Sequence, residues 1–544
     1  MSRKPAATKH FRLFADVEGL NVGQGHIADG ISAGEKWFVF AGSSISVALT
    51  CNLLAGCAVG PDFQKPPAPE VTAYTPKPLA HRTVSAESRG GAAQHFVQDL
   101  DIAGQWWEIF HSRPLNDLVE DALKHNPDVQ AAQAGLRVAR ETTEAQKGAF
   151  YPQLGGNYNS YTQKVASVVS PPGSTTSDYL TLHTAQLDVS YTPDVFGLVR
   201  REVESDEALA AVQQFQVEAT YLTLTSNVVA GAIQEASLRG QIAATKKIIA
   251  IESDLLRLLR LQKKLGQVAE ADVAPQEAVL AQAEETLPPL EKQLAQQRDL
   301  LTALAGRYPS EEVAERFTLE SLRLPHELPV SLPSKVVEQR PDVQAASATL
   351  HSASAAIGVA IANRLPVINL TANLSTSFTD LALLFTPNAN AYLLTAAVVQ
   401  PLFDGFTLYH KQRAAEAAYD QAEATYRSTV ITAFQNVADT LRAIQADARA
   451  FKAAVAAENA AKKSLDIVRK QASLGQLNAL AVLNAEQTYQ QALLTRVQAE
   501  ASRYADTAAL FQALGGGWWN RNDIPPQEPF DLADVLRISA PAPK

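Results

Sequence analysis

An internal duplication is the feature of this sequence that most restricts how the chain can fold. The residues NPDVQAA at 126–132 recur as RPDVQAA at 340–346. Three more short matches follow in the same order in both halves: Phe196-Gly197 with Asp404-Gly405, Leu265-Gly266-Gln267 with Leu474-Gly475-Gln476, and Ala303–Gly306 with Gln512–Gly515. Because matches in a fixed order rarely arise by chance, we expect two copies of one structural unit that pack against each other.

Each unit is expected to open with a helix and to continue with a β-hairpin. Asn126 can cap the first helix, and a proline at the first helical position needs no N–H partner. These helices should end near Gly148 and Asn363. Apolar and polar residues then alternate, clearly in 184–191 and 368–375 and less cleanly near 150–164 and 390–400. Loop-forming residues between these segments indicate one strand pair in each unit.

The second part of each unit predicts a long helical hairpin. After Gly197 and Gly405 the helical pattern continues for about 66 to 70 residues, which is roughly 100 Å of helix. Gly266 and Gly475 end the long helices, and return helices of about 38 residues follow. Core-type residues occupy equivalent positions in both copies and alanine dominates elsewhere, so we expect the helices to pack closely side by side.

The only two cysteines lie in one apolar stretch near the N-terminus. Cys51 and Cys57 therefore exclude a disulfide framework or a cysteine metal site further along the chain. The apolar run 37–54 leads into Leu54-Ala55-Gly56-Cys57, which resembles the cleavage box of bacterial lipoprotein signal sequences. The resemblance implies that Cys57 is the acylated first residue of the mature chain. A single transmembrane helix is the alternative, although several serines and an asparagine weaken it.

The residue after Cys57 bears on the destination of the chain. Ala58 stands where an aspartate in Gram-negative lipoproteins usually signals inner-membrane retention, so the resemblance implies a lipid anchor in the outer membrane. We find no later apolar stretch long enough for a spanning helix, so any further crossing should use strands.

Four strands per chain cannot close a barrel, because about eight are needed and an open edge in lipid leaves backbone groups unpaired. Two chains would give a filled eight-stranded barrel, whereas three would give twelve strands and a lumen, which we favour.

Several motifs, taken in order, are similar to the lipoprotein (NodT-like) branch of the TolC-type outer-membrane factor family. They are the cysteine box followed by VGPDF at 59–63, Trp106-Trp107, the repeated Pro-Asp-Val, and ALGGGW at 513–518. The resemblance covers 57–544. It implies an α+β membrane protein: a trimeric twelve-stranded β-barrel, with four strands per chain, continued by a long α-helical barrel and surrounded by a mixed equatorial belt.

The resemblance also implies a division of the chain and a set of partners. Residues 1–56 would be the removed signal region, 57–112 the lipid-anchored segment and belt, 113–306 and 334–515 the two repeats, 307–333 a linker, and 516–544 a tail in the belt. The homotrimer would extend from the outer-membrane lipid into the periplasm. There it would meet a periplasmic adaptor, also called a membrane fusion protein, and an inner-membrane pump of the resistance-nodulation-division (RND) type. No cofactor and no metal are expected.

Carried over position by position, the resemblance places a periplasmic gate at the tip of the second hairpin. Leu480 would form a hydrophobic collar, followed by Asn484 and Gln487. Relatives often have an acidic residue at the position of Asn484 and a basic residue at that of Gln487. This mouth is therefore expected to lack a strong charged ring and to select cations weakly.

Adaptor docking is expected at the two hairpin turns, Leu265-Gly266-Gln267 and Leu474-Gly475-Gln476. The alternative is that these glycines only terminate helices. Asp272 and Pro275 would give the first tip a different surface. Trp106 and Trp107 precede a helix, which favours packing inside the belt over a place at the membrane interface.

Other function classes find little support. A net charge of -10 without a Lys/Arg stripe argues against nucleic-acid binding. The histidines are scattered and no metalloprotease or phosphate-loop motif occurs, so we predict no enzyme and no catalytic residue. Two alternatives to an efflux duct stay open: the outer-membrane channel of a type I protein secretion system, and a lipid-anchored coiled-coil structural lipoprotein. The latter would not need alternating strand pairs.

Overall fold

The computed structural model describes residues 58–71, 73–164, 179–331, 333–384, 386 and 389–521. The described residues form one compact unit, and Cys57 with the preceding apolar run lies outside them. The described part is mostly helical and contains a four-stranded sheet, so the fold is α+β, as predicted.

The helices repeat the same series in both halves of the chain. The first half contains α3 (Pro127–Lys147), α4 (Leu198–Lys264) and α5 (Glu270–Leu304); the second contains α7 (Pro341–Ala362), α8 (Thr407–Ser473) and α9 (Ala479–Ala513). Both long helices have 67 residues and both return helices have 35. The duplication therefore extends to the lengths of the elements, although the return helices are somewhat shorter than the sequence pattern predicted.

The two opening helices start in different ways. The side chain of Asn126 accepts the N–H of Asp128 at 2.9 Å and so caps α3. Arg340 stands at the equivalent position before α7 and has no capping side chain. Its guanidinium donates instead to the carboxylate of Asp342 and to the carbonyl of Ala513, which ties α7 to the end of α9.

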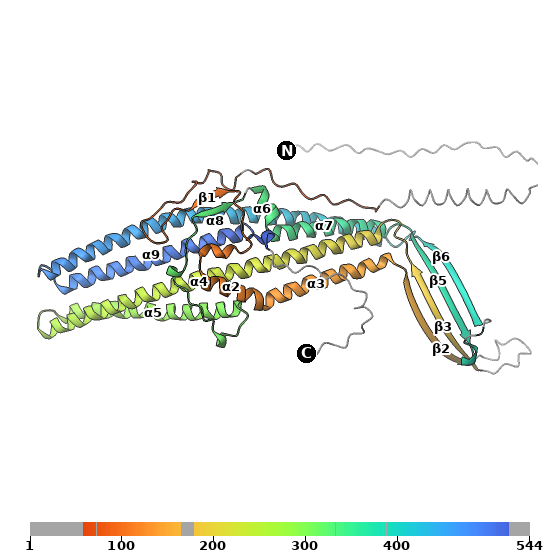
Figure 1. Ribbon diagram of the computed structural model, residues 1–544, viewed down its shortest axis with the longest axis horizontal. Helices are drawn as coiled ribbons and strands as arrows, with labels where there is room; N and C mark the ends of the chain where they lie inside the picture. Colours follow the sequence, from red (N-terminus) through yellow and green to blue (C-terminus); the bar gives the residue numbers. More distant parts are fainter. Residues whose placement is uncertain are drawn as a thin grey trace, which may run out of the picture. The chain divides into compact units, whose positions relative to one another are not determined.

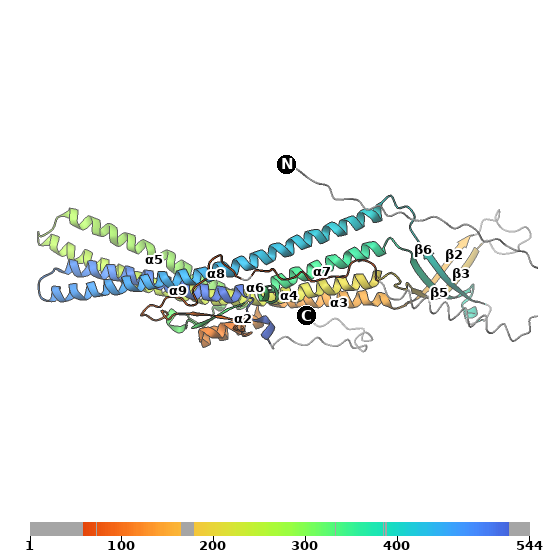
Figure 2. The ribbon, with the colours of Figure 1, turned by 90° about the horizontal axis from the view of Figure 1, so that it is seen from above.

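Short helices line the long ones, as the lengths predicted. Both α3 and α5 pack on α4, while α9 packs on α4 and α8, and α7 lies between α4 and α8. Figures 1 and 2 show α3 and α5 beside opposite ends of α4. Among the described residues, α7 alone is long and apolar enough to pass as a membrane-spanning helix, which the sequence reading missed. Its contacts with α4 and α8 identify it as a core helix of the helical bundle.

The four-stranded sheet joins the two repeats. Its strands are β2 (Gln153–Lys164), β3 (Tyr179–Tyr191), β5 (Val367–Phe378) and β6 (Asn390–Val399), in the order β2-β3-β5-β6 and all antiparallel. The hairpin of the first repeat thus pairs with that of the second through β3 and β5. Within this sheet β2 and β6 each have one free edge.

The segments outside the repeats pack on the helices. They include β1 (His95–Gln98), which pairs in parallel with β4 (Glu327–Val330), the 3-10 helix η1 (Trp106–Phe110), α2 (Arg113–His125) and α6 (Pro333–Gln339). Trp106 and Trp107 are buried, and the Trp106 ring stacks on Phe511 of α9 with centroids 5.6 Å apart. The prediction that these tryptophans pack inside the protein is confirmed.

Candidate functional site

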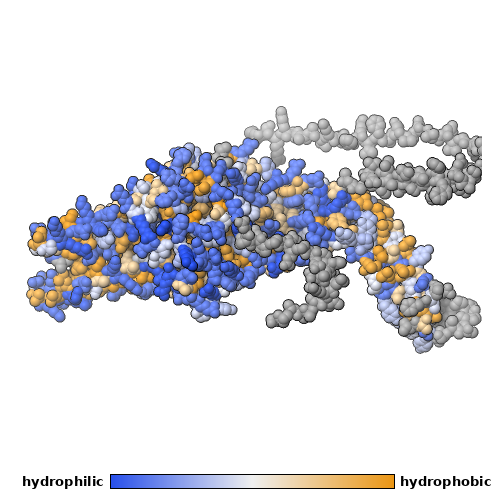
Figure 3. All heavy atoms as spheres, in the orientation of Figure 1, coloured by the Kyte–Doolittle hydropathy of each residue, from blue (hydrophilic) through white to orange (hydrophobic). Residues whose placement is uncertain are grey.

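One face of the four-stranded sheet is apolar and exposed. Leu187 of β3 lies opposite Leu374 of β5, which in turn lies opposite Tyr392 of β6. These three side chains are 44%, 55% and 79% exposed. Figure 3 shows hydrophobic residues gathered over the strands. A contiguous apolar surface of this kind marks a region covered by lipid or by another protein.

The opposite face of the sheet is polar and hydrogen-bonded across the strands. The carboxylate of Asp188 on β3 accepts the Asn157 amide of β2 at 2.6 Å and also the amide of Gln186. Thr184 of β3 and Ser377 of β5 lie within hydrogen-bonding distance, 3.3 Å apart. Strand β6 departs most from the pattern, because Leu393 and other apolar residues occupy its positions on this face, and Leu182 of β3 is also apolar there.

The N-terminal residues are held where the strands pass into the helices. The N–H of Val59 donates to the carbonyl of Phe196 at 3.0 Å, between β3 and α4. Gly197 has a φ of +81°, and a Cβ there would lie 2.5 Å from the side chain of Ala58. Gly60 crosses α7 equally closely, since a Cβ on it would lie 2.4 Å from the Cα of Gly358. The predicted lipidation residue Cys57 lies outside the described residues, but its neighbour Ala58 sits at this junction.

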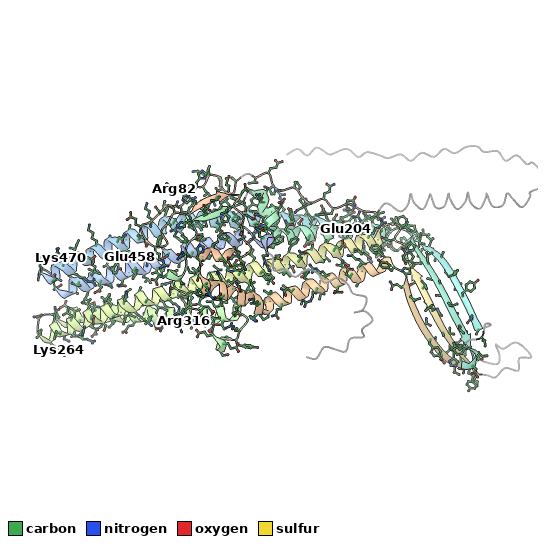
Figure 4. The ribbon with its side chains drawn as sticks, viewed as in Figure 1. Arg82, Glu204, Lys264, Arg316, Glu458 and Lys470 are labelled. Carbon is green, nitrogen blue, oxygen red and sulfur yellow. The ribbon has the colours of Figure 1, made fainter. Side chains whose placement is uncertain are left out.

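Arg201 of α4 fixes this N-terminal segment. Its side chain is nearly buried, donates to the carbonyl of Val59 at 3.1 Å and pairs with Asp62 at 2.8 Å. It also pairs with Glu204, which is labelled in Figure 4, at 2.7 Å. Phe63 stacks on His351 of α7. The VGPDF segment at 59–63 is thus held against α4 and α7 of the same chain. No local pattern in the sequence indicated the role of Arg201, because its partners Val59 and Asp62 lie about 140 residues away in the chain.

The two hairpin turns have the same geometry. Gly266 and Gly475 have φ values of +72° and +74°, and each following N–H closes the same backbone bond at 2.9 Å, Gln267 to Gln262 and Gln476 to Gln471. Leu265 and Leu474 are both 65% exposed. Lys264 and Lys470, labelled in Figure 4, mark the neighbouring ends of the long helices. The glycines therefore terminate helices, and the predicted docking residues around them are exposed.

The predicted gate residues lie just beyond the second turn. Leu480 and Leu483 are partly buried and pack against a tip cluster on the first hairpin, made of Leu255, Leu256, Leu259 and Val273. Asn484 is exposed and Gln487 is half-buried. In this structure Leu480 therefore links the two hairpins of one chain.

Hydrogen bonds and ion pairs stabilise the tip of each helical hairpin. The carboxylate of Asp272 accepts the N–H of Ala269 at 2.9 Å and so caps α5, a role that the sequence reading did not assign to it. Asn478 caps α9 in the reverse sense, because it precedes the helix and accepts the N–H of Ala481. Repeat-equivalent ion pairs then join the two helices of each hairpin: Arg260 with Glu277 at 2.8 Å, and Arg469 with Glu486 at 2.7 Å.

Two charged clusters lie further from the tips. Glu235 of α4 is fully buried and accepts Arg298 of α5 at 2.9 Å and Arg239 at 2.7 Å. Partial burial, together with the neighbouring carboxyl of Asp447, raises the pKa of Asp506 to about 7. Within the described part of the chain, no group of three or more His, Cys, Asp or Glu residues is arranged to hold a metal ion.

Comparison with known proteins gives one consistent result. The family described as "Outer membrane efflux protein" matches residues 118–307 and 332–516. The probable efflux pump outer membrane protein TtgC of Pseudomonas putida is 26% identical over 483 residues, covering 88% of this chain and 96% of the relative. The pyoverdine export outer membrane protein OpmQ of Pseudomonas aeruginosa is 28% identical over 479 residues, covering 87% and 97%.

The structure also resembles solved outer-membrane channels. The Campylobacter jejuni CmeC outer membrane channel superposes with a TM-score of 0.74 at 20% identity, over 85% of this chain and 95% of that one. At this level of identity the match establishes a shared fold.

Proposed function

Since this chain belongs to the outer membrane efflux protein family, we propose that it is the outer-membrane exit duct of a tripartite efflux system. Members of the family are passive conduits, which agrees with the prediction that the chain is not an enzyme. In this proposal three copies form a twelve-stranded barrel that continues as a helical barrel into the periplasm. A periplasmic adaptor and an RND-type pump of the inner membrane deliver the substrate and the energy.

The observation that carries the proposal is the open sheet. Its apolar face suits lipid and its polar face suits an aqueous lumen, but β2 and β6 each leave one edge unpaired within the sheet. An unpaired edge is not tolerated in lipid, because each unsatisfied backbone group costs several kcal/mol. Joining β6 of one copy to β2 of the next repeats the β3–β5 joint and closes the ring.

The opening helices support the same closure. The helices α3 and α7 are equivalent and have 21 and 22 residues. Yet only two residues of α3 are buried, compared with nine residues of α7. The difference arises because α7 packs between α4 and α8, while α3 packs mainly on α4. Because α3 packs on α4 as α7 packs on α8, the free flank of α3 is equivalent to the flank of α7 that α4 covers. In the proposed trimer, α8 of a neighbouring copy covers it.

The position of the N-terminal residues fits a lipid anchor at Cys57. Ala58 lies at the junction between the strands and the helices, where a barrel would meet the periplasmic surface of the outer membrane. Acyl chains on the preceding residue would reach the inner leaflet from there. We therefore place the protein in the bacterial outer membrane, anchored at Cys57 and extending into the periplasm.

Gating in this proposal acts on the contact between the two hairpins. Leu480 and Leu483 rest on the tip cluster, so the second hairpin must leave the first before the mouth can widen. An adaptor that binds Leu265, Gly266 and Gln267, or Leu474, Gly475 and Gln476, more tightly in the open state would shift this equilibrium. The exposed amide of Asn484 and the half-buried Gln487 would leave the mouth without a charged ring.

Planar-bilayer recording and gene deletion together test the proposal. Purified, acylated protein should insert as a trimer that conducts ions. The deletion strain should accumulate small efflux substrates until the wild-type gene is restored. A protein that never conducts would favour a structural lipoprotein. A deletion that stops export of one protein but leaves small-molecule accumulation unchanged would favour the secretion channel.

A further inference from the structure

A single carboxylate stands on the polar face of the sheet. Among all residues of β2, β3, β5 and β6, Asp188 is the only aspartate or glutamate. It lies three residues before the end of β3, which places it about 10 Å from the junction with the helices. We propose that Asp188 is the cation-selecting residue of the barrel, contributing one carboxylate per chain to a ring that faces the lumen. The inference rests on the proposed trimeric channel.

The side chains around Asp188 orient its carboxylate but do not neutralise its negative charge. Both of its hydrogen-bond donors are neutral side-chain amides, from Asn157 and Gln186. Among the described residues, no lysine, arginine or histidine forms an ion pair with it. The two amides fix the direction of the carboxylate, while its negative charge stays available to a passing cation.

The space beside Asp188 is also open. Its direct partner on β2 is Gly155, which has no side chain, and a Cβ built there would meet no atom within 4 Å. Its partner on β5 is the neutral Asn373. The two basic side chains of these strands, Lys164 and His183, stand at positions of opposite parity, on the apolar face. The polar face of each chain therefore carries one negative charge and no positive charge.

The size of the barrel sets the expected strength of selection. Twelve tilted strands about 4.8 Å apart enclose a backbone radius of about 12 Å, so the carboxylates would lie roughly 8 Å from the axis. The Debye length is about 10 Å at 0.1 M salt and about 3 Å at 1 M. Ions on the axis should therefore sense the ring at low salt and hardly at all at high salt. Because the proposed mouth is uncharged at Asn484, selection would occur in the barrel and not at the gate.

Two opposite substitutions test the inference in the full acylated protein. Reversal potentials are measured in planar bilayers across a tenfold KCl gradient, at low and at high mean salt. We expect a cation preference that Asp188→Asn lowers at least twofold. Asn373→Asp, which adds a charge beside Asp188, should raise it. Both effects should shrink as salt approaches 1 M.

The possible failures are distinguishable. If the wild-type protein forms no channels, the proposed function fails and the inference falls with it. If channels form but the cation preference is the same in wild type, Asp188→Asn and Asn373→Asp, the inference is overturned while the channel stands. Unchanged single-channel conductance at 1 M KCl confirms that each variant has assembled normally, and the gain-of-charge variant keeps the test decisive if Asp188→Asn does not assemble.

Discussion

The seam between neighbouring subunits can be predicted residue by residue from the duplication. Both hairpins have the same register: Gln153, the first residue of β2, pairs with Ser190, and Val367, the first residue of β5, pairs with Val399. Ser190 stands eight residues before α4, and Val399 stands eight residues before α8. Strands β2 and β5 are therefore equivalent, as are β3 and β6.

The joint inside the chain then supplies the register of the joint between chains. Ser190 pairs with Thr371, the fifth residue of β5. By equivalence Val399 should pair with the fifth residue of β2 in the next subunit, which is Asn157. The internal joint contains nine residue pairs. A seam of this length removes enough unpaired backbone groups from lipid to be worth on the order of tens of kcal/mol, so the trimer should survive mild detergent.

Cysteine pairs measure this register directly. Two positions further along the seam from the predicted Val399–Asn157 pair, Ala397 should face Asn159 of the next subunit. Residues that face each other across two strands have Cβ atoms about 5 Å apart. The double variant Ala397→Cys, Asn159→Cys should give covalent dimers and trimers with a short thiol crosslinker in isolated outer membranes. The sequence beyond Cys57 contains no other cysteine, so the product is unambiguous.

The control differs by one residue. In Ala397→Cys, Ser160→Cys the second thiol points to the opposite face of the sheet, because successive strand residues alternate. It should give little crosslinking. Equal crosslinking in both variants, or none in either, would refute the register and the closure on which it rests.

Three further predictions concern the helices. Leu480→Ala removes about half of a leucine's burial, about 1 kcal/mol per chain, and should raise the open probability in bilayers, while Leu474→Ala, at an exposed site, should not. Because the folded pKa of Asp506, about 7, exceeds its unfolded value, its contribution to stability is complete below about pH 4 and is lost as pH rises through 7. The free energy of unfolding should fall by about 1–2 kcal/mol between pH 5 and pH 8, after allowing for solvent screening, and Asp506→Asn should flatten this dependence. Arg298→Met removes the more buried of the two partners of the Glu235 carboxylate and leaves only Arg239, so it should cost up to about 3–5 kcal/mol in denaturant unfolding, part of which Glu235→Gln in the same chain should restore.

The helices and strands could be predicted because their signals are local. A glycine at a positive φ ends each long helix, and alternation of apolar and polar residues marks β3 and β5. The return helices were predicted slightly too long because the apolar pattern continues into the turns. Strand β6 gave a weaker signal because Leu393 and Ala397 occupy positions on its polar face.

Contacts between distant segments could not be predicted in this way. A period of two assigns side chains to faces but does not choose the partner strand, so the β3–β5 joint required the structure. The contact of Leu480 with the tip cluster depends on the register between α9 and α4, which no local pattern encodes. Asp272 was predicted as part of an adaptor surface, whereas in the structure its carboxylate also caps α5.

The strand-to-helix junctions of the two repeats are covered differently, and this difference supports the proposed trimer. At the junction of β3 with α4, residues 58–60 of the same chain fill the space, and Arg201 holds them there. The equivalent junction before α8 carries Leu402, Phe403 and Phe406, which are 94%, 80% and 63% exposed. So large an apolar surface is not stable in water. It lies beside the free edge of β6, so in the proposed trimer the subunit that pairs with this edge, together with the membrane surface, would cover it.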